Sequence, residues 1–270
     1  MSLKKDALEL LKETSRTFYI PINRLPPGLK DAVASAYLCM RAIDEIEDDP
    51  DLDRSVKIKI LQQMSALLQS GVNHHSFGNN LNGWEYYGKL PEVSLRLAEW
   101  ATLAPETIAP RIWDATAAMA DRMAYWVNDS WQIHSEADLN RYTFSVAGAV
   151  GLLLSDLWAW YDGTNSNRTQ AIAYGRGLQA VNILRNHNED LIRGVDFYPK
   201  GWQNKDMHAY AKRNLSYADA YTKALPAGPA LDFCLIPLTL AHATLEVMDG
   251  GLPKLSRHQV MHLIAQVTGI

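Results

Sequence analysis

Residues 28–48, GLKDAVASAYLCMRAIDEIED, decide how this chain folds. Small and aliphatic residues recur every three or four positions, which is the period of an α-helix. These apolar residues cover most of the helix surface, so we expect the helix to be buried. Tyr37, Arg41, Asp44 and Asp48 follow one another at spacings of four, three and four, so they share one face. A polar face on a buried helix predicts a site inside an all-helical protein.

The rest of the 270-residue chain has the same helical period, and alternating strand patterns are nearly absent. The Gly- and Asn-rich residues 70–88 are the expected long loop. Neither a composition break nor an internal repeat divides the chain, so we predict one all-α domain over residues 1–270. The predicted helices span residues 3–18, 28–47, 53–70, 91–103, 107–132, 136–160, 167–193, 204–225, 229–248 and 256–267.

Composition narrows the function classes. A net charge of -4 without a run of basic residues gives no reason to expect a nucleic-acid partner. The two cysteines, Cys39 and Cys234, lie in apolar helical patterns and are expected to be reduced core thiols. The start is acidic and amphipathic, unlike a signal peptide, and the longest apolar run is about half of what a membrane span needs. We therefore expect a cytoplasmic protein without a transmembrane anchor.

The pair Asp44 and Asp48 has two interpretations. Carboxylates four residues apart converge above a helix, which is unfavourable unless a cation lies there. Mg²⁺ is commonly held by one or two carboxylates together with substrate phosphates. Alternatively, the two acids pair with Arg41 and nearby lysines at an ordinary helix end. A second polar stripe decides between these interpretations.

That second stripe lies in residues 171–194, AIAYGRGLQAVNILRNHNEDLIRG. Gln179, Asn182, Asn186 and Asp190 follow spacings of three, four and four on a helix otherwise rich in aliphatic residues, and Arg193 continues the line. An unpaired buried amide costs about 1–3 kcal/mol, so these side chains need partners. Two such stripes that face each other across a helical bundle predict a metal–diphosphate site.

Six segments in order resemble those of the squalene/phytoene synthases, and more those of the squalene synthase branch. The similarity covers most of the chain. The segments are TSRTF (14–18), YLCMRAIDEIEDD (37–49), MADRMAYW (119–126), LNRYTFSVAGAVG (139–151), QAVNILRNHNED (179–190) and FCLIPLTLAHATL (233–245).

The resemblance implies an isoprenoid-synthase helical bundle with a central cavity. In such a cavity two allylic diphosphates, farnesyl or geranylgeranyl, are joined head to head with Mg²⁺. The roles it implies are metal ligation by Asp44, Asp48, Asn186 and Asp190, diphosphate binding by Arg16, Arg41 and Arg193, and lining of the reacting centre by Tyr142, Gln179 and Asn182 beside Arg41. The implied pocket walls, each of which could also be plain core, are Phe18, Tyr37, Met123, Trp126, Phe197 and Phe233.

The sequence departs from the family pattern at five positions. Asn186 stands where the second motif starts with Asp, and Val195 stands where a basic residue follows that motif. Ala120 and Arg122 replace glycines, and Thr143 replaces a cysteine. The first stripe is intact, so binding and ionisation of one diphosphate are expected.

The departures leave several chemistries open. The chain couples two prenyl groups head to head, or transfers one to another acceptor such as an aromatic ring. Alternatively it acts on a single substrate as a prenyl diphosphate phosphatase or terpene cyclase, or it is a non-catalytic prenyl-lipid binder. We expect at most a peripheral membrane contact for product release. Chain length, acceptor, use of NADPH and oligomeric state are left open.

Overall fold

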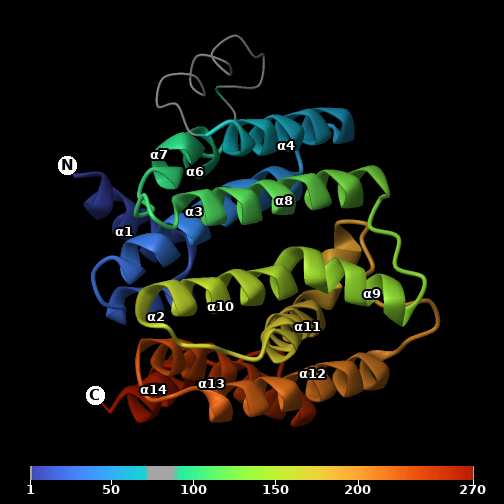
Figure 1. Cartoon of the computed structure of the whole chain (residues 1–270). Helices are drawn as coiled ribbons and strands as arrows, with labels where there is room; N and C mark the ends of the chain where they lie inside the picture. Colours follow the sequence, from blue (N-terminus) through green and yellow to red (C-terminus); the bar gives the residue numbers. More distant parts are fainter. Residues whose placement is uncertain (1, 72–87, 89, 270) are drawn as a thin grey trace. The chain divides into compact units, whose positions relative to one another are not determined.

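The computed structural model describes residues 2–71, 88 and 90–269, without the side chain of Arg16 (Figure 1). All regular structure in these residues is helical. The all-α prediction is therefore confirmed. The chain divides into two compact units, Met1–Ser130 and Trp131–Ile270, each of which has its own packing.

The first unit is built around α3, Leu29–Asp48, which packs against α6, α7 and α8. Small side chains on α3 let its neighbours come close, and serine hydroxyls on α3 and α6 donate to carbonyl groups across the contacts. Ser35 Oγ donates to the carbonyl of Trp100 at 2.7 Å, and Ser94 Oγ donates to that of Ala42 at 2.8 Å. The unit consists of α1 (Leu3–Thr14), α2 (Arg16–Arg24), α3, α4 (Arg54–Gln69), α6 (Glu92–Leu95), α7 (Leu97–Ala101) and α8 (Ala109–Asn128).

The second unit is built around α11, Arg168–Ile192, which packs most extensively on α12. It also contacts α10 and α13, and Tyr174 Oη donates to the carbonyl of Cys234 on α13 at 2.9 Å. The unit consists of α9 (Glu136–Thr143), the π-helical turn η2 (Phe144–Gly148), α10 (Ala149–Asp162), α11, α12 (Asn204–Ala224), α13 (Pro229–Asp249) and α14 (Arg257–Thr268).

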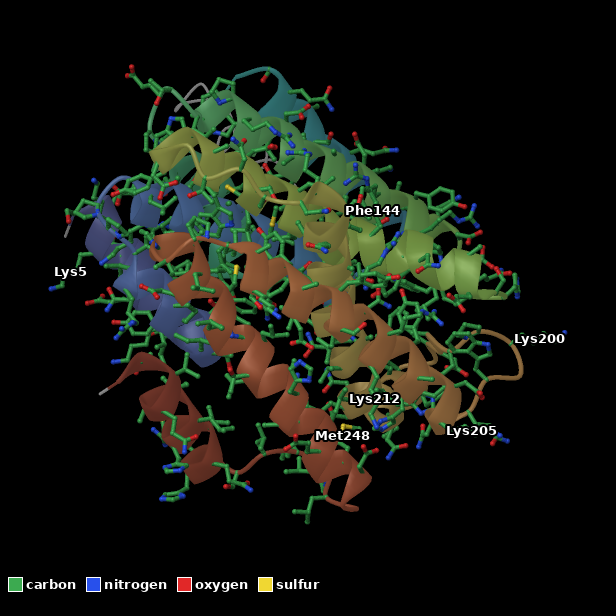
Figure 2. The ribbon with its side chains drawn as sticks, turned by 60° about the horizontal axis from the view of Figure 1, so that its bottom comes forward. Lys5, Phe144, Lys200, Lys205, Lys212 and Met248 are labelled. Atoms are coloured by element: carbon green, nitrogen blue, oxygen red, sulfur yellow. The ribbon has the colours of Figure 1, made fainter. Side chains whose placement is uncertain are left out.

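Two glycines bring the η2–α10 segment against α11 at backbone distance. A Cβ added at Gly151 would lie 2.0 Å from the carbonyl oxygen of Ala171, and one at Gly175 would lie 2.1 Å from that of Ala147. No side chain fits in such a space. The π-helical turn begins at Phe144, labelled in Figure 2, directly after Tyr142 and Thr143. Because a π turn inserts an extra residue into a helix, it reorients the side chains around it.

The predicted helices are correct in kind, and three of them are interrupted. The predicted helix 3–18 ends at Thr14, because the Oγ of Ser15 accepts from the amide of Phe18 at 3.2 Å and starts a new helix there. The predicted helix 91–103 breaks at Arg96, which pairs with Asp6, Glu92 and Glu99. The predicted helix 136–160 contains η2. The expected loop 70–88 lies almost wholly outside the described residues. The single-domain prediction stays a prediction.

Two further sequence expectations concern burial. Cys39 and Cys234 are both buried and free, as expected for core thiols. Among the described residues, two helical stretches are long and apolar enough for a membrane span by length and composition alone, Glu136–Asp162 and Pro229–Asp249. Roughly half of each lies inside the protein, as in ordinary core helices, so the expected absence of a transmembrane anchor stays a prediction.

We predict that Gly175→Ala destabilises the second unit. The added methyl group must push η2 away from α11, and overpacking of this kind costs about 1–3 kcal/mol. For a chain of this size that lowers Tm by roughly 2–10 °C. Circular dichroism during heating measures it. Gly250→Ala is the matched control, since its Cβ would meet its nearest atom at 3.4 Å. An unchanged Tm for Gly175→Ala would show that the two backbones are not in close contact.

Candidate active site

The acidic face of α3 forms the first half-site. Part of the Asp44 side chain is reached by solvent, but enough protein surrounds its carboxyl for burial to raise its pKa to about 7. The neighbouring charge of Asp48 raises this pKa further, and Arg41 lowers it by less. Burial and a like charge thus make ionisation of Asp44 unfavourable unless a cation is present.

Arg41 is turned along the helix toward another acid. Its Nη2 donates to Glu45 in an i, i+4 ion pair, while its buried Nε has no partner among the described residues. An unsatisfied buried N–H on a guanidinium costs free energy that a bound anion would recover. This supports the prediction that Arg41 binds a diphosphate oxygen.

Two predicted wall residues come together next to this face. Phe18 on α2 and Tyr37 on α3 lie with ring centroids 5.9 Å apart, and Tyr37 hydrogen-bonds to Ser15. Burial is the largest cause of the raised pKa of Tyr37, so it stays a neutral phenol. Met123 and Trp126, both on α8, are each 2% exposed and belong to the core of the first unit. The Arg16 side chain lies outside the described residues.

The donor set of α3 fits Mg²⁺. The two carboxylates lie one turn apart, and Asp44 bears an electrostatic cost that a divalent cation would remove. Among the described residues no group of three or more His, Cys, Asp or Glu side chains could hold a metal. A cation at α3 would therefore take its remaining oxygen ligands from water and a bound diphosphate, as is common for Mg²⁺.

The second half-site follows α11. Gln179, Asn182 and Asn186 are half-buried along one face of the helix, and Asp190 is buried at its end. Arg193 Nη2 donates to the carboxylate of Asp190 at 2.6 Å. The sequence reasoning thus placed the stripe correctly on one helix face. That it faces the α3 stripe, across a central cavity, stays a prediction.

The segment after α11 folds back and completes this half-site. Phe197 stacks on Tyr142 with centroids 4.5 Å apart and planes at 17°. His187 stacks on Tyr198 at 3.8 Å, which fixes the segment against the helix. Sequence reasoning missed His187 and Tyr198. The signal for Tyr198 is the aromatic pair after Gly194, a residue with φ +81° that allows the chain to reverse, whereas His187 had no signal in the sequence.

Other predicted residues lie in structural contacts. Phe233 packs on Trp158 with centroids 5.5 Å apart, in the core of the second unit. Thr143, which replaces the family's cysteine, is hydrogen-bonded to Tyr210 at 3.0 Å and so joins α9 to α12. Val195 donates its amide to the carbonyl of Asp190 at 3.0 Å, which makes it part of the helix cap.

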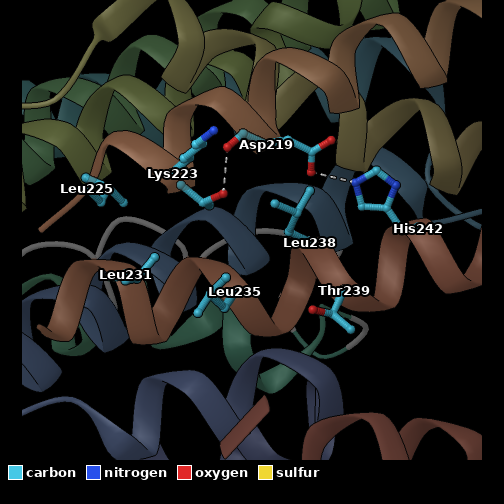
Figure 3. A pocket seen from close by; sticks show the side chains of 9 residues that line it. Asp219, Lys223, Leu225, Leu231, Leu235, Leu238, Thr239 and His242 are labelled. Carbon is cyan, nitrogen blue, oxygen red and sulfur yellow. Dashed lines mark hydrogen bonds and ion pairs between the residues drawn. The ribbon is translucent and has the colours of Figure 1, made fainter. Parts of the chain in front are cut away.

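A groove of about 410 Å³ between α12 and α13 contains none of the predicted site residues (Figure 3). Its floor is lined by leucines, and His242 Nε2 lies 2.8 Å from Asp219 Oδ1 at its rim. The groove holds one charge pair and no arrangement of carboxylates. The chemistry predicted from the two stripes therefore lies elsewhere in the chain.

A family model described as squalene/phytoene synthase matches residues 11–206, which include both stripes and the segment that carries Phe197. The chain belongs to the squalene/phytoene synthase family. The resemblance stated from the six sequence segments is thereby confirmed.

Squalene synthases are among the curated relatives of this chain. That of Schizosaccharomyces pombe is 30% identical, with 88% of this chain and 58% of the relative covered. That of Dictyostelium discoideum is 32% identical, with 90% of this chain and 63% of the relative covered. The chain thus spans about three fifths of the length of these relatives.

Solved structures show the same fold. A squalene synthase, TcSQS, in complex with the ligand E5700 has a TM-score of 0.79 at 22% identity, with 96% of this chain and 84% of that chain covered. A dehydrosqualene synthase in complex with a ligand has a TM-score of 0.71 at 17% identity, covering 99% and 96% respectively. The fold is the all-α isoprenoid synthase fold.

We predict that Mg²⁺ stabilises the chain more at pH 8 than at pH 5.5. In the absence of metal the pKa of Asp44 rises from 3.8 to about 7 on folding, so the folded protein prefers the protonated carboxyl. The stability that this protonated carboxyl contributes is lost as pH rises from about 4 to above 7. Mg²⁺ binds the ionised pair and offsets this loss. At a concentration 100 times Kd, binding adds about 2.7 kcal/mol, or roughly 5–10 °C in Tm.

Thermal unfolding at both pH values, with and without Mg²⁺, measures the effect. Asp44→Asn should abolish the pH-dependent part. Asp51→Asn, an exposed change in the loop after the same helix, should retain it. An equal Mg²⁺ shift at both pH values would place the cation away from Asp44.

Proposed function

We propose that the chain is a Mg²⁺-dependent prenyltransferase that ionises an allylic isoprenyl diphosphate and couples its prenyl group to an acceptor. The acceptor favoured by family membership is a second prenyl diphosphate, joined head to head. The observation that carries the proposal is the half-buried carboxyl of Asp44 beside Asp48 and Arg41 on α3. This arrangement is costly in the free protein and useful only when a cation and an anion bind.

Ionisation breaks the allylic C–O bond, and both electrons of the bond leave with the diphosphate. When bound, Mg²⁺ supplies charge stabilisation for that leaving group. Asp44 and Asp48 would hold the ion, and the Nε of Arg41 would donate to a diphosphate oxygen. Hydrogen bonds aimed at developing negative charge in a site that excludes water are among the largest contributions to catalysis.

The allylic cation that remains needs walls that stabilise positive charge and exclude water. The stacked pair Tyr142–Phe197 and the pair Phe18–Tyr37 provide aromatic faces next to the two stripes. The double bond of the acceptor then supplies the electron pair of the new C–C bond, and a proton is released to restore neutrality. Gln179 and Asn182 lie on the α11 face where they would orient the acceptor.

Product analysis tests the proposal. Purified protein is incubated with farnesyl diphosphate and Mg²⁺, with and without NADPH, and the extracted products are separated by mass. We expect a C30 product and release of inorganic diphosphate. Farnesol or a C15 hydrocarbon alone would contradict coupling and identify an enzyme with a single diphosphate substrate. Bound but unchanged farnesyl diphosphate would identify a non-catalytic binder.

We predict that Asp44→Asn lowers diphosphate release by about 10²-fold or more, as expected for the loss of a group that stabilises the leaving group's charge. The release of inorganic diphosphate under saturating substrate measures it. Asp51→Asn, which keeps the α3 stripe intact, should retain activity within about twofold, as expected for a change outside the site. Full activity of Asp44→Asn would remove the α3 pair from the mechanism.

A second candidate, a prenyl diphosphate phosphatase or terpene cyclase, is favoured by one observation. The α11 stripe carries Asn186 in place of a carboxylate, and its remaining acid, Asp190, is already paired with Arg193. A weakened second half-site would leave water or an internal double bond as the acceptor. Asn186→Asp separates the candidates, because it should raise the ratio of C30 product to farnesol only if the second half-site limits coupling.

A further inference from the structure

The α11 stripe carries its own cation. Asp190 is buried, with a side chain that is 9% exposed, and it accepts from Arg193 Nη2 at 2.6 Å across one helical turn. At this distance the hydrogen bond is charge-assisted, as between an ionised carboxylate and a guanidinium. Asp190 differs from the acid of an exposed helix-end pair, because removing Arg193 would leave its buried charge without this cation.

The other oxygen that would ligate a metal is engaged in the same way. Asn186 lies one turn before Asp190, and its side-chain oxygen accepts from Arg185 Nε at 3.1 Å. One side-chain oxygen of each residue of the i, i+4 pair therefore accepts from a guanidinium. The pair contributes a single negative charge, which Arg193 neutralises. A divalent cation would have to compete with a guanidinium at each of the two residues.

The α3 stripe has the opposite electrostatics. It has two carboxylates at the corresponding spacing, and its arginine, Arg41, makes its ion pair with Glu45. With Asp44, Asp48 and Glu45 against the single cation Arg41, acidic groups outnumber basic ones on this face. The two stripes look alike in the sequence, but only one attracts a divalent cation. The α11 stripe does not fit a metal.

We infer that Arg193 takes the place of a metal ion at the α11 stripe, so that this half-site holds a diphosphate through guanidinium N–H groups. A guanidinium has five donors in a planar fork, which matches carboxylate and phosphate oxygens, so it can connect Asp190 to a diphosphate as a cation would. The Arg193 side chain is 43% exposed, which leaves it open to a ligand. The inference deepens the proposed function and rests on it for the identity of the anion.

Mn²⁺ binding tests the inference without turnover. Titration of the full chain is followed by the electron paramagnetic resonance signal of free Mn²⁺, for wild type, Asp44→Asn, Asp190→Asn and Glu189→Gln. Glu189 is an exposed acid next to Asp190 and serves as the matched control. We expect Asp190→Asn and Glu189→Gln to bind Mn²⁺ like wild type, and Asp44→Asn to bind at least tenfold more weakly. Loss of one Mn²⁺, or tenfold weaker binding, in Asp190→Asn alone would overturn the inference.

A gain of binding tests it from the other side. The double variant Asn186→Asp with Arg193→Gln should bind one more Mn²⁺ than wild type, whereas Asn186→Asp with Arg193→Lys, which keeps the cation, should not. Both contain the same carboxylates, so a difference between them is due to the charge at position 193. Equal binding by the two double variants would overturn the inference. If the wild-type protein binds no Mn²⁺, the α3 half-site of the proposed function is contradicted. The comparison of the two double variants still tests whether Arg193 excludes a metal from the α11 stripe.

Inorganic diphosphate tests the anion. Calorimetry in EDTA should show binding to wild type that Arg193→Gln weakens about tenfold, the scale of one charged hydrogen bond. Lys205→Gln is the control, since Lys205 is an exposed cation at the start of α12, labelled in Figure 2. Failure of wild type to bind in EDTA, or binding by Arg193→Gln as tight as that of wild type, would overturn the role of Arg193. Neither result depends on whether C30 product is formed.

Discussion

The carboxyl of Asp44 is the charge on which the functional argument depends. It lies on a helix whose other faces are occupied by small and aliphatic side chains, beside a second carboxylate one turn away. Asp44 is half-buried and Asp48 is exposed, and burial and like charge both raise the cost of ionising Asp44. The first unit tolerates it because the packing of α3 against α6, α7 and α8 fixes the helix independently of its polar face. The stored electrostatic cost is what a cation and a diphosphate would relieve.

The second unit positions its polar face by a different constraint. Gly151 and Gly175 allow the η2–α10 segment to meet α11 with backbone in contact with backbone, so α11 has little freedom to rotate about its axis. The orientation of Gln179, Asn182 and Asp190 follows from that contact. The π-helical turn adjoins Tyr142, whose ring is held by the stack with Phe197. Gly175 lies one turn before Gln179 on the same face of α11, so this backbone contact fixes the direction of the polar stripe that follows it.

Helical period and residue spacing were sufficient to predict the class of fold, the helices and the membership of both stripes. These features depend on contacts within a few residues, which a sequence pattern records directly. The break at Ser15, the turn η2 and the return of Phe197 onto Tyr142 could not be predicted, because each depends on a capping bond or on packing between distant segments. The ion pair between Arg193 and Asp190 could not be predicted either. Spacing placed both residues on one face but did not show which oxygen the guanidinium would contact.

The difference between the stripes assigns unequal tasks to them. A divalent cation concentrates two charges at one point, whereas a guanidinium spreads one charge over a plane. The diphosphate that leaves during ionisation develops more negative charge than one that is only held, and it needs the stronger stabilisation. Under the proposed function, α3 with Asp44, Asp48 and Arg41 would therefore activate the prenyl donor. The α11 stripe with Arg193 would hold the diphosphate of the acceptor in place, which requires geometry and charge complementarity but no bond cleavage.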